Sequence, residues 1–425
     1  MPNDMVPATG RMPSGAVSGM LLRFGLLGAA QLAGSALSFL TAIIITRVGG
    51  AAVFGQYSLG LSVLAYALVA TNFGTDISGV RMAAADPKRI GTLIPAILII
   101  RLFFGSLAFA LILLFSPVLA SDPIGRATLL IISAGVFAAV FLPAWLPQGI
   151  ENIRVTALVI LAPFVLTFAF TVASALFRPQ GVVFAVSRLA ADALVATTLL
   201  AWCGQFLERP HWTAIRKTIF DLLGQSSAIA GSELVRGLAF LSDMLIVSFF
   251  FQDATVGHFS AAYRIYLLLI AVAAMYSIVL FPKLSRAAAI GPEAVRAELK
   301  STLLWTVPIA ASGTLVFIVV VPWVLPFAFG VDFSTAVPAL QLLGIAATLN
   351  FVHRNYSRTL IAMGLAGVDL HLKSIVTFVG IALKVLGTSQ WGMTGTAAGI
   401  LLSETILLVI LHRATRARLR GDDAK

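Results

Sequence analysis

Residues Ile90–Phe115 read IGTLIPAILIIRLFFGSLAFALILLF, an apolar stretch in which Arg101 is the only charged residue. A helix that crosses the hydrocarbon core of a bilayer needs about 20 consecutive, mainly apolar residues. This stretch is long enough for one crossing. It therefore predicts a transmembrane helix that carries one arginine inside the membrane.

The composition of the whole chain agrees with that stretch. Of the 425 residues, 59% are apolar and 11% are charged. Soluble proteins contain about 45–50% apolar and about 25% charged residues. A water-soluble fold of this length could not bury so much apolar surface, which excludes soluble enzymes, nucleic-acid-binding proteins and disordered proteins. We expect an all-α, polytopic membrane protein with about twelve transmembrane helices.

The expected spans are long apolar runs separated by short polar or Pro/Gly-containing loops. They are Phe24–Thr46, Tyr57–Gly79, Ile90–Phe115, Ala127–Leu146, Val155–Phe177, Val182–Trp202, Leu222–Phe250, Val256–Phe281, Thr302–Phe327, Ala336–Val352, His371–Leu386 and Met393–Leu411. The eleventh span is the weakest, because it is short and contains Lys373 and Lys384.

The basic residues are unevenly divided between the two sets of loops. One set carries only Arg47, Arg126, Arg178 and Lys384, whereas most other lysines and arginines fall on the opposite set and on the terminal segments. Cytoplasmic loops are the ones enriched in lysine and arginine, so both termini are expected in the cytoplasm. The net charge of +11 is then explained by the membrane topology and by attraction of the basic loops to anionic lipids. It requires no nucleic-acid partner. We expect no cleavable signal peptide.

A weak internal repeat divides the chain into two halves. The segment Ser38–Ser58 ends in Gly55-Gln-Tyr-Ser, and the segment Ser242–Ser260 ends in Gly257-His-Phe-Ser, each at the junction between two spans. Six spans separate the two segments, so the halves have the same orientation, as in transporters built from parallel repeats. We expect two six-helix lobes around a central cavity. The expected parts are a cytoplasmic N-terminal segment 1–20, an N-lobe 21–205, a cytoplasmic linker 206–218, a C-lobe 219–411 and a basic cytoplasmic tail 412–425.

Several motifs, taken together in their order and spacing, are typical of one family. They are RVGGAAVFGQYS from Arg47, TNFGTDISGVR from Thr71, AYRIY from Ala262, LFPKLSR from Leu280, AVPALQLLG from Ala336 and WGMTGTAAG from Trp391. Through them the chain resembles the oligosaccharide flippases of bacterial polysaccharide biosynthesis, whose superfamily also contains multidrug and toxic-compound extruders. The resemblance covers roughly residues 20–411.

The resemblance implies a substrate and a location. Members of the family move undecaprenyl-pyrophosphate-linked sugar repeats across the bacterial inner membrane. Lipid II flippases of the family typically have two more helices than this chain can hold, which favours an O-antigen, exopolysaccharide or capsule substrate. Expected partners are the lipid-linked oligosaccharide, membrane lipids and possible assembly proteins such as a polysaccharide polymerase and glycosyltransferases.

Charged residues inside the predicted spans are the candidate substrate-binding site, because a charge at that depth normally faces a cavity or a partner. The candidates are Arg264, Arg101, Arg236, Arg188 and Arg47. Arginine binds phosphate bidentately and stays charged, so such residues could replace the hydration of a pyrophosphate group. The alternatives are structural. Arg188 can pair with Asp192 and Arg236 with Glu233, while Arg47 can reach the headgroup level or bridge the lobes.

Two acidic residues are candidates for ion coupling. Asp76 lies beside Asn72 near one end of the second span, where it could also cap the helix or pair with Arg81. Glu404 lies deep in the last span and could also be a hydrogen-bonded structural acid. His258 and His353 are expected near the membrane edges and are weak candidates. The sequence contains no metal-binding, catalytic or phosphate-loop motif, so we expect no metal, no cofactor and no enzymatic activity.

These observations predict a flippase that exports a lipid-linked oligosaccharide by alternating access. Two alternatives remain open. The first is a multidrug or toxic-compound cation antiporter with the same fold, which the intramembrane arginines disfavour. The second is a membrane scaffold for glycan assembly that transports nothing.

Overall fold

The structure of the chain, a computed structural model, describes residues 14–120, 122–176, 180–206 and 211–420. Within these ranges, the side chains of residues 14–24, 228, 232, 235, 236, 238–241 and 278 lie outside the description. The helices are α1 Ser14–Asn72, α2 Thr75–Ala85, α3 Ile90–Leu119, α4 Pro123–Ser133, α5 Gly135–Val140, α6 Trp145–Gly149, α7 Ile153–Ala175, α8 Gly181–Cys203, α9 Trp212–Phe250, α10 Asp253–Ile290, α11 Pro292–Phe329, α12 Val337–Ala362 and α13 Ala366–Arg420. Short 3-10 turns lie at Pro87–Arg89, Gly204–Phe206 and Val331–Ala336.

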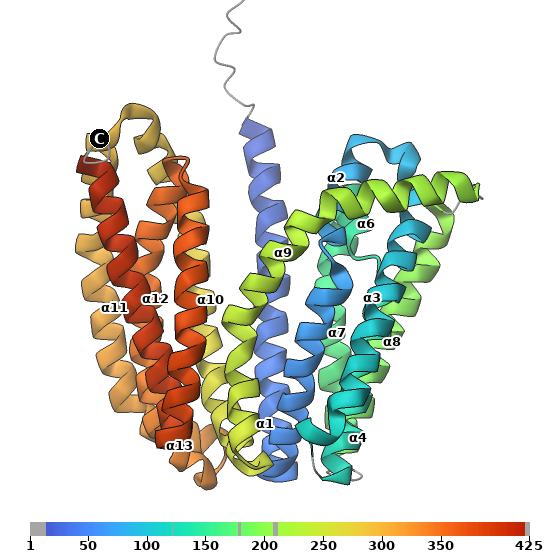
Figure 1. Ribbon diagram of the computed structural model, residues 1–425, viewed down its shortest axis with the longest axis horizontal. Helices are drawn as coiled ribbons and strands as arrows, with labels where there is room; N and C mark the ends of the chain where they lie inside the picture. The colour runs from blue at the N-terminus through green and yellow to red at the C-terminus, as the bar shows by residue number, and fades with distance from the viewer. Residues whose placement is uncertain (1–13, 121, 177–179, 207–210, 421–425) are drawn as a thin grey trace, which may run out of the picture.

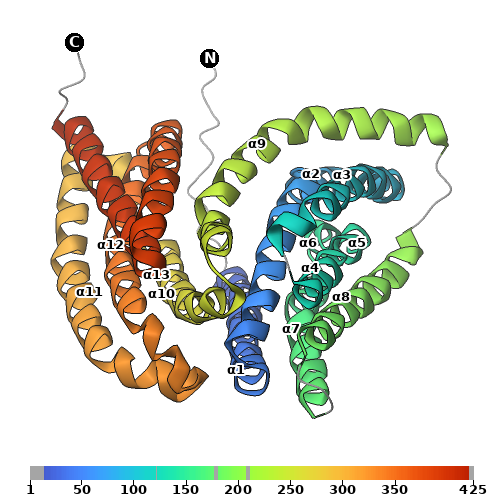
Figure 2. The ribbon, with the colours of Figure 1, turned by 60° about the horizontal axis from the view of Figure 1, so that its bottom comes forward.

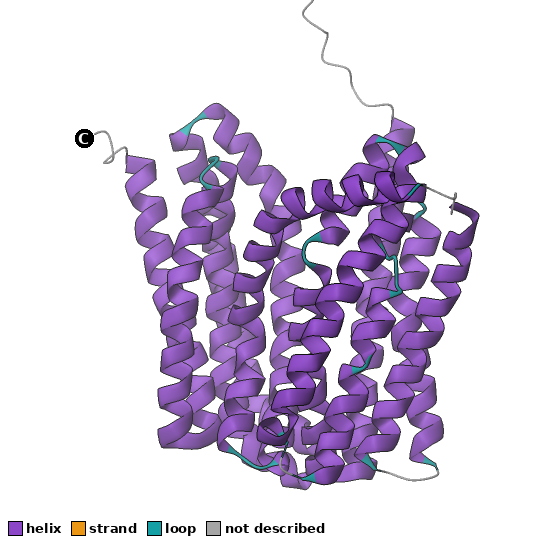
Figure 3. Cartoon of the chain, turned by 45° about the vertical axis from the view of Figure 1, so that its right-hand side comes forward, coloured by secondary structure: helices purple, strands orange, loops and turns teal. Residues whose placement is uncertain are grey.

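The described part of the chain is almost entirely helical and contains no strand (Figure 3). Nine of its helical segments are long and apolar enough to cross a membrane. Two of these, in α1 and α13, are far longer than the ~30 Å bilayer core requires. Each contains a chain reversal, at Gly50 in α1 and at Trp391–Gly392 in α13, and so crosses twice. With the descending part of α9, the described residues supply the twelve crossings that the sequence predicts.

The twelve crossings form two lobes (Figures 1 and 2). Helices α1–α8 build the N-lobe, and α10–α13 with the descending part of α9 build the C-lobe. We term the face at which α13 ends at Arg420 the terminal face, and the opposite face, with the reversals at Gly50 and Gly392, the turn face. The ribbons of the lobes lie apart at the terminal face and come together at the turn face (Figure 1).

Two of the expected spans are interrupted. The second ends at Asn72, and a tight turn with positive φ at Phe73 (45°) and Gly74 (73°) starts the separate helix α2. The fourth, expected as one helix, is the series α4, α5 and α6. Pro143 lies in the break between α5 and α6. Because proline has no backbone N–H, it cannot donate the hydrogen bond that would continue the helix. These interruptions matter because they release backbone and side-chain polar groups inside the N-lobe.

The expected inter-lobe linker differs from the structure at its second half. Residues 207–210 lie outside the description, but α9 already begins at Trp212 and runs as one helix to Phe250. Its first part lies across the terminal face and then bends down between the lobes (Figure 1). There Ser226 donates to Ser78 of α2 at 2.8 Å, and Arg89 pairs with Asp221 at 3.4 Å. The start of α9 is therefore attached to the N-lobe, although the sequence after residue 219 was expected in the C-lobe.

Apolar side chains also cover the outside of the bundle. Among the exposed ones are Phe103, Leu114, Trp323 and Phe327, all more than 60% exposed. Exposed apolar surface of this extent is typical of contact with lipid. The chain is a multi-pass membrane protein.

Candidate functional site

The lobes touch backbone to backbone at the turn face. A Cβ atom on Gly55 of α1 would lie 1.8 Å from the carbonyl oxygen of Asp253 in α10. A Cβ atom on Gly257 of α10 would lie 1.9 Å from the carbonyl oxygen of Ala51 in α1. Gly55 and Gly257 are equivalent positions of the internal repeat. The repeat therefore forms a reciprocal contact in which only glycine allows this approach, and it closes the turn face.

Side chains reinforce this closure. Phe329 at the end of α11 packs edge-on against Phe39 of α1, with ring centroids 5.6 Å apart, and lies 6.3 Å from the ring of Phe54. Arg47 of α1 donates from Nε to the carbonyl oxygen of Ala328 at 3.0 Å and from Nη2 to that of Phe327. A cation that binds the free carbonyls at a helix C-terminus is favourable. The structure thus places Arg47 in a bridge between the lobes.

Two arginines from opposite lobes lie on the closed side of the inter-lobe seam. Arg264 of α10 donates to Ser38 Oγ of α1 at 3.1 Å, and its guanidinium lies 5.4 Å from the ring centre of Phe54. Arg188 of α8 pairs with Asp192 at 2.7 Å. Both arginines line one narrow cavity of about 10 Å³, enough for about one water molecule. The other residues that line it are Ser38, Thr41, Tyr57, Leu61, Phe164 and Thr167.

The charges around this cavity, which we term the arginine seam, do not balance. Asp192 compensates Arg188, whereas none of the ion pairs within the described ranges includes Arg264. Thr167, which also lines the cavity, has a buried hydroxyl without a hydrogen-bond partner in the described structure. An uncompensated guanidinium beside a free hydroxyl group can bind an anion.

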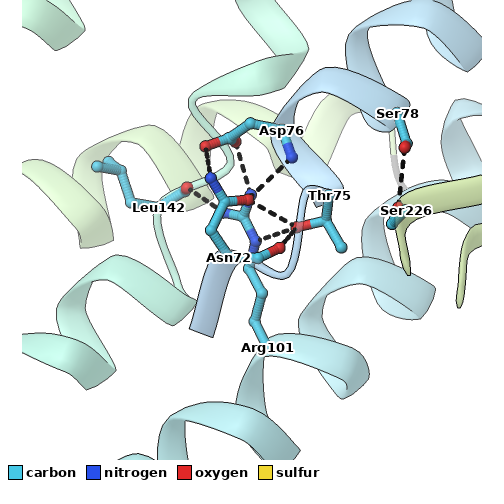
Figure 4. Close-up of polar contacts among 7 residues, drawn as sticks. All are labelled: Asn72, Thr75, Asp76, Ser78, Arg101, Leu142 and Ser226. Carbon is cyan, nitrogen blue, oxygen red and sulfur yellow. Dashed lines mark hydrogen bonds and ion pairs between the residues drawn. The ribbon is translucent and has the colours of Figure 1, made fainter. Parts of the chain in front are cut away.

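Arg101 has a different environment (Figure 4). It is 4% exposed and contacts Asp76 at 2.6 Å, Thr75 Oγ1 at 2.8 Å and Asn72 Oδ1 at 3.2 Å. It also donates to the carbonyl oxygen of Leu142 at 3.3 Å. The sequence offered no acidic partner at helical spacing for Arg101, and the structure supplies Asp76 from another helix. This cluster joins the break between α1 and α2 to the break after α5.

The same cluster accounts for Asp76, the first candidate for ion coupling. Asp76 accepts from Arg101 and from Asn72 Nδ2 at 2.8 Å, so its partner is neither Arg81 nor a helix end alone. Arg81 instead contacts Gln225 of α9 at 2.5 Å. A carboxylate held by a buried guanidinium has its charge compensated by the protein itself.

A second, larger cavity of about 600 Å³ lies in the C-lobe, between α9, α10, α12 and α13. Glu404, the second candidate for ion coupling, is one of the residues that line it. The Glu404 carboxylate contacts His353 Nε2 at 2.7 Å, Asn350 Nδ2 at 3.1 Å and the hydroxyl of Tyr266 at 3.4 Å. His353, expected near a membrane edge, is 4% exposed and therefore packs inside the helix bundle. The only feature of the sequence that could have indicated the role of His353 is its position one helical turn after Asn350, which also contacts Glu404.

Lys384 corrects another expectation. It was expected near the end of the eleventh span and counted with the basic residues of the outer face, but it lies well inside α13 with 6% of its side chain exposed. Its ammonium group contacts Asp243 Oδ1 and, at 2.8 Å, Ser242 Oγ, while Tyr263 donates to Asp243 Oδ2 at 2.8 Å. The eleventh crossing is consequently not short, because the α13 helix extends past Lys384 to the reversal at Trp391. Two charges at mid-helix are tolerated because they neutralise each other.

The remaining candidate, Arg236, lies on α9, but its side chain falls outside the described residues. Glu233, one turn earlier, lines the C-lobe cavity. The residues that the structure describes contain no cluster of three histidine, cysteine, aspartate or glutamate side chains suited to a metal ion.

The two lobes of membrane-crossing helices are joined at the turn face and enclose polar cavities, which is the architecture of a polytopic membrane protein. The model of the family described as polysaccharide biosynthesis proteins matches residues 23–288, and the chain belongs to this family. No curated protein is significantly similar to it in sequence.

Comparison with solved structures supports the same fold. An inward-facing multidrug resistance MATE family transporter of the MOP superfamily is 16% identical, with a TM-score of 0.72 over 92% of this chain and 96% of that one. The lipid II flippase MurJ in an inward closed conformation is also 16% identical, with a TM-score of 0.73 over 92% of this chain and 87% of that one. An outward-facing multidrug resistance MATE family transporter of the MOP superfamily is also 16% identical, with a TM-score of 0.57 over 98% of this chain and 100% of that one.

Proposed function

We propose that this transporter is a flippase for a polyprenyl-diphosphate-linked oligosaccharide, of the O-antigen, exopolysaccharide or capsule type, in the bacterial inner membrane. The terminal face is the cytoplasmic face, since the basic tail and most other basic residues fall on the loops and ends of that side. The chain then has its closed end toward the outside. The higher TM-scores against the two inward conformations than against the outward one support this assignment.

The observation that carries the proposal is the uncompensated charge of the arginine seam. A diphosphate must cross a region where water cannot solvate it, and its negative charge needs donors that stay ionised. Arg264 and Arg188 approach one cavity from opposite lobes, so an anion there would contact both lobes. A cation would be repelled by the same pair, which disfavours the drug-antiporter alternative.

Substrate binding at the arginine seam would also change the equilibrium between a conformation with the turn face closed and one with the turn face open. Arg264 now bonds to Ser38 and lies over Phe54, both in the N-lobe, and thereby helps to hold the turn face closed. A phosphate that binds Arg264 replaces these contacts. A ligand shifts a conformational equilibrium by its different affinity for the two states, so the diphosphate favours opening of the turn face.

The C-lobe cavity supplies the rest of the binding surface. It is lined by tyrosine, asparagine, serine and histidine side chains, which suit sugar hydroxyl groups. Its volume of about 600 Å³ is in the range of ordinary ligand pockets. The Glu404–His353 pair inside it is our candidate for proton coupling, because one proton added or removed there changes the charge of the cavity.

The test is translocation in reconstituted vesicles. The protein is supplied with a fluorescent polyprenyl-diphosphate glycan, and a membrane-impermeant quencher reports the leaflet in which the label lies. Arg264→Ala should slow translocation by roughly tenfold or more, because hydrogen bonds to charged groups contribute about 1.5–3 kcal/mol. Arg286→Ala, an exposed arginine on the same helix, is the matched control and should leave the rate unchanged.

The alternatives give different results in the same vesicles. A cation antiporter would move a lipophilic cationic dye and change the pH of the lumen. A scaffold would move neither the glycan nor the dye. Wild-type rates in both Arg264→Ala and Arg188→Ala would contradict the arginine seam as the diphosphate site.

A further inference from the structure

A groove that none of the preceding functions uses lies at the terminal face, between the start of α11 and the end of α13. Its volume is about 610 Å³. Arg296 of α11 donates to the carbonyl oxygen of Leu419 in α13 at 2.9 Å and ties the two helices together there. The start of α11 and the end of α13 lie on the side of the C-lobe that is farther from the N-lobe (Figures 1 and 2). The groove is thus remote from the arginine seam.

Charge is concentrated at the terminal end of the groove. Its lining includes the basic residues Arg296, Lys300, Arg416 and Arg420, together with His412. None of the described residues that line the groove is acidic. The basic residues follow one another at intervals of one turn, at 296 and 300 on α11 and at 412, 416 and 420 on α13. They consequently face the groove from both sides.

Deeper along α11 the lining becomes apolar. Leu303, Leu304, Val307 and Pro308 continue the face that begins with Arg296 and Lys300. From Arg296 to Pro308 this face rises by about 18 Å. A cluster of basic residues followed by an apolar channel of that length matches the shape and charge of a phospholipid. Its phosphate would lie at the membrane surface among the basic residues, and an acyl chain would lie in the bilayer along the channel.

The floor of the groove contains a polar group that lacks a partner. The hydroxyl of Thr415, a residue 1% exposed, makes no hydrogen bond with the part of the chain that the structure describes. It lies between His412 and Arg416 along the same helix. The ring of His412 packs edge-on against Tyr356 of α12, with centroids 5.2 Å apart. Tyr356 thus contributes α12 to the lining of the groove.

We propose that this groove binds an anionic glycerophospholipid from the leaflet at the terminal face. The phosphate contacts Lys300 and Arg416, and an acyl chain lies along Leu304 and Val307. We commit to a bilayer phospholipid rather than the lipid-linked glycan, because the helix ends that form the groove lie on the side of the C-lobe away from the inter-lobe seam. A bound lipid of this kind joins α11 to the end of α13, and so stabilises the C-lobe without taking part in translocation.

The test is lipid retention by the purified full-length protein, measured by native mass spectrometry with thermal unfolding in parallel. Phosphatidylglycerol should be retained at least about tenfold better than phosphatidylcholine, since each nearby basic residue contributes about a factor of five toward an anionic lipid. The double variant Lys300→Gln/Arg416→Gln should lose most of that preference. The matched control Lys283→Gln/Arg286→Gln, two exposed basic residues of α10, should keep it.

A second variant tests the apolar part independently of charge. Leu304→Trp, at a position 64% exposed, should fill the channel and lower retention without altering the fold. Equal retention of the two phospholipids would overturn the proposal, as would a preference that survives the Lys300/Arg416 double variant. Displacement of phosphatidylglycerol by a polyprenyl-diphosphate glycan at the same residues would overturn it too, and would make the groove an entry site for substrate.

Discussion

Gly55 and Gly257 occupy equivalent positions in the two halves of the chain, and each lies against the backbone of the other half. The carbonyl oxygen of Asp253 faces Gly55, and that of Ala51 faces Gly257. Since a side chain at either position would overlap a carbonyl oxygen, the closed turn face depends on both glycines. The internal repeat has therefore become the contact surface between the lobes.

Gly55→Ala should shift the protein toward opening at the turn face, because the added methyl group would lie 1.8 Å from the Asp253 oxygen if nothing moved. Spin labels on the two lobes near this face should show a population at longer distance. Gly313→Ala is the control, since a Cβ at Gly313 meets no atom within 4 Å. An unchanged distance distribution in Gly55→Ala would show that the seam can adapt without opening.

Arg101→Leu should destabilise the N-lobe strongly. The substitution leaves Asp76, Asn72 and Thr75 without their shared donor, and breaking a buried ion pair costs about 3–5 kcal/mol. The side chain of Asp76 is 43% exposed, so we expect the loss in the free energy of unfolding to be about 3 kcal/mol or less. Thermal unfolding in detergent measures it. Arg89→Ala, which removes the exposed pair with Asp221, should change stability by less than about 1 kcal/mol.

Lys384→Met should also destabilise the protein, because it leaves the buried Asp243 carboxylate without its ammonium partner. The double variant Asp243→Asn/Lys384→Met should recover much of the lost stability, since neither charge remains. A double-mutant cycle on thermal unfolding isolates the interaction between the two residues. Additive effects of the two single variants would mean that the pair is not energetically coupled.

Glu404→Gln should flatten the pH dependence of translocation. The variant keeps the size of the side chain but removes the proton that Glu404 and His353 can share. Initial rates in vesicles between about pH 5.5 and 8, the range in which histidine commonly titrates, provide the measurement. Asp76→Asn is the matched control and should retain the wild-type profile. The reverse result would assign the coupling role to Asp76.

Sequence alone determined the membrane class, the number of crossings and the division into two lobes. These properties depend on local composition: an apolar run of sufficient length must cross the bilayer as a helix, because its backbone has no other way to satisfy its polar groups there. The repeat was detectable for the same reason, since its glycines and aromatic residues recur at fixed offsets. Arg188 and Asp192 were recognisable as a pair because they are one helical turn apart.

The tertiary structure alone decided which intramembrane charges are compensated. The partners of Arg101, Lys384 and Glu404 lie 25, 141 and 51 residues away in the chain. Helical periodicity relates only residues that are three or four positions apart, so no pattern in the sequence could reveal these contacts. Packing of the helices brings them together, and it leaves Arg264 of one lobe beside Arg188 of the other with one positive charge unmatched in the described part of the molecule.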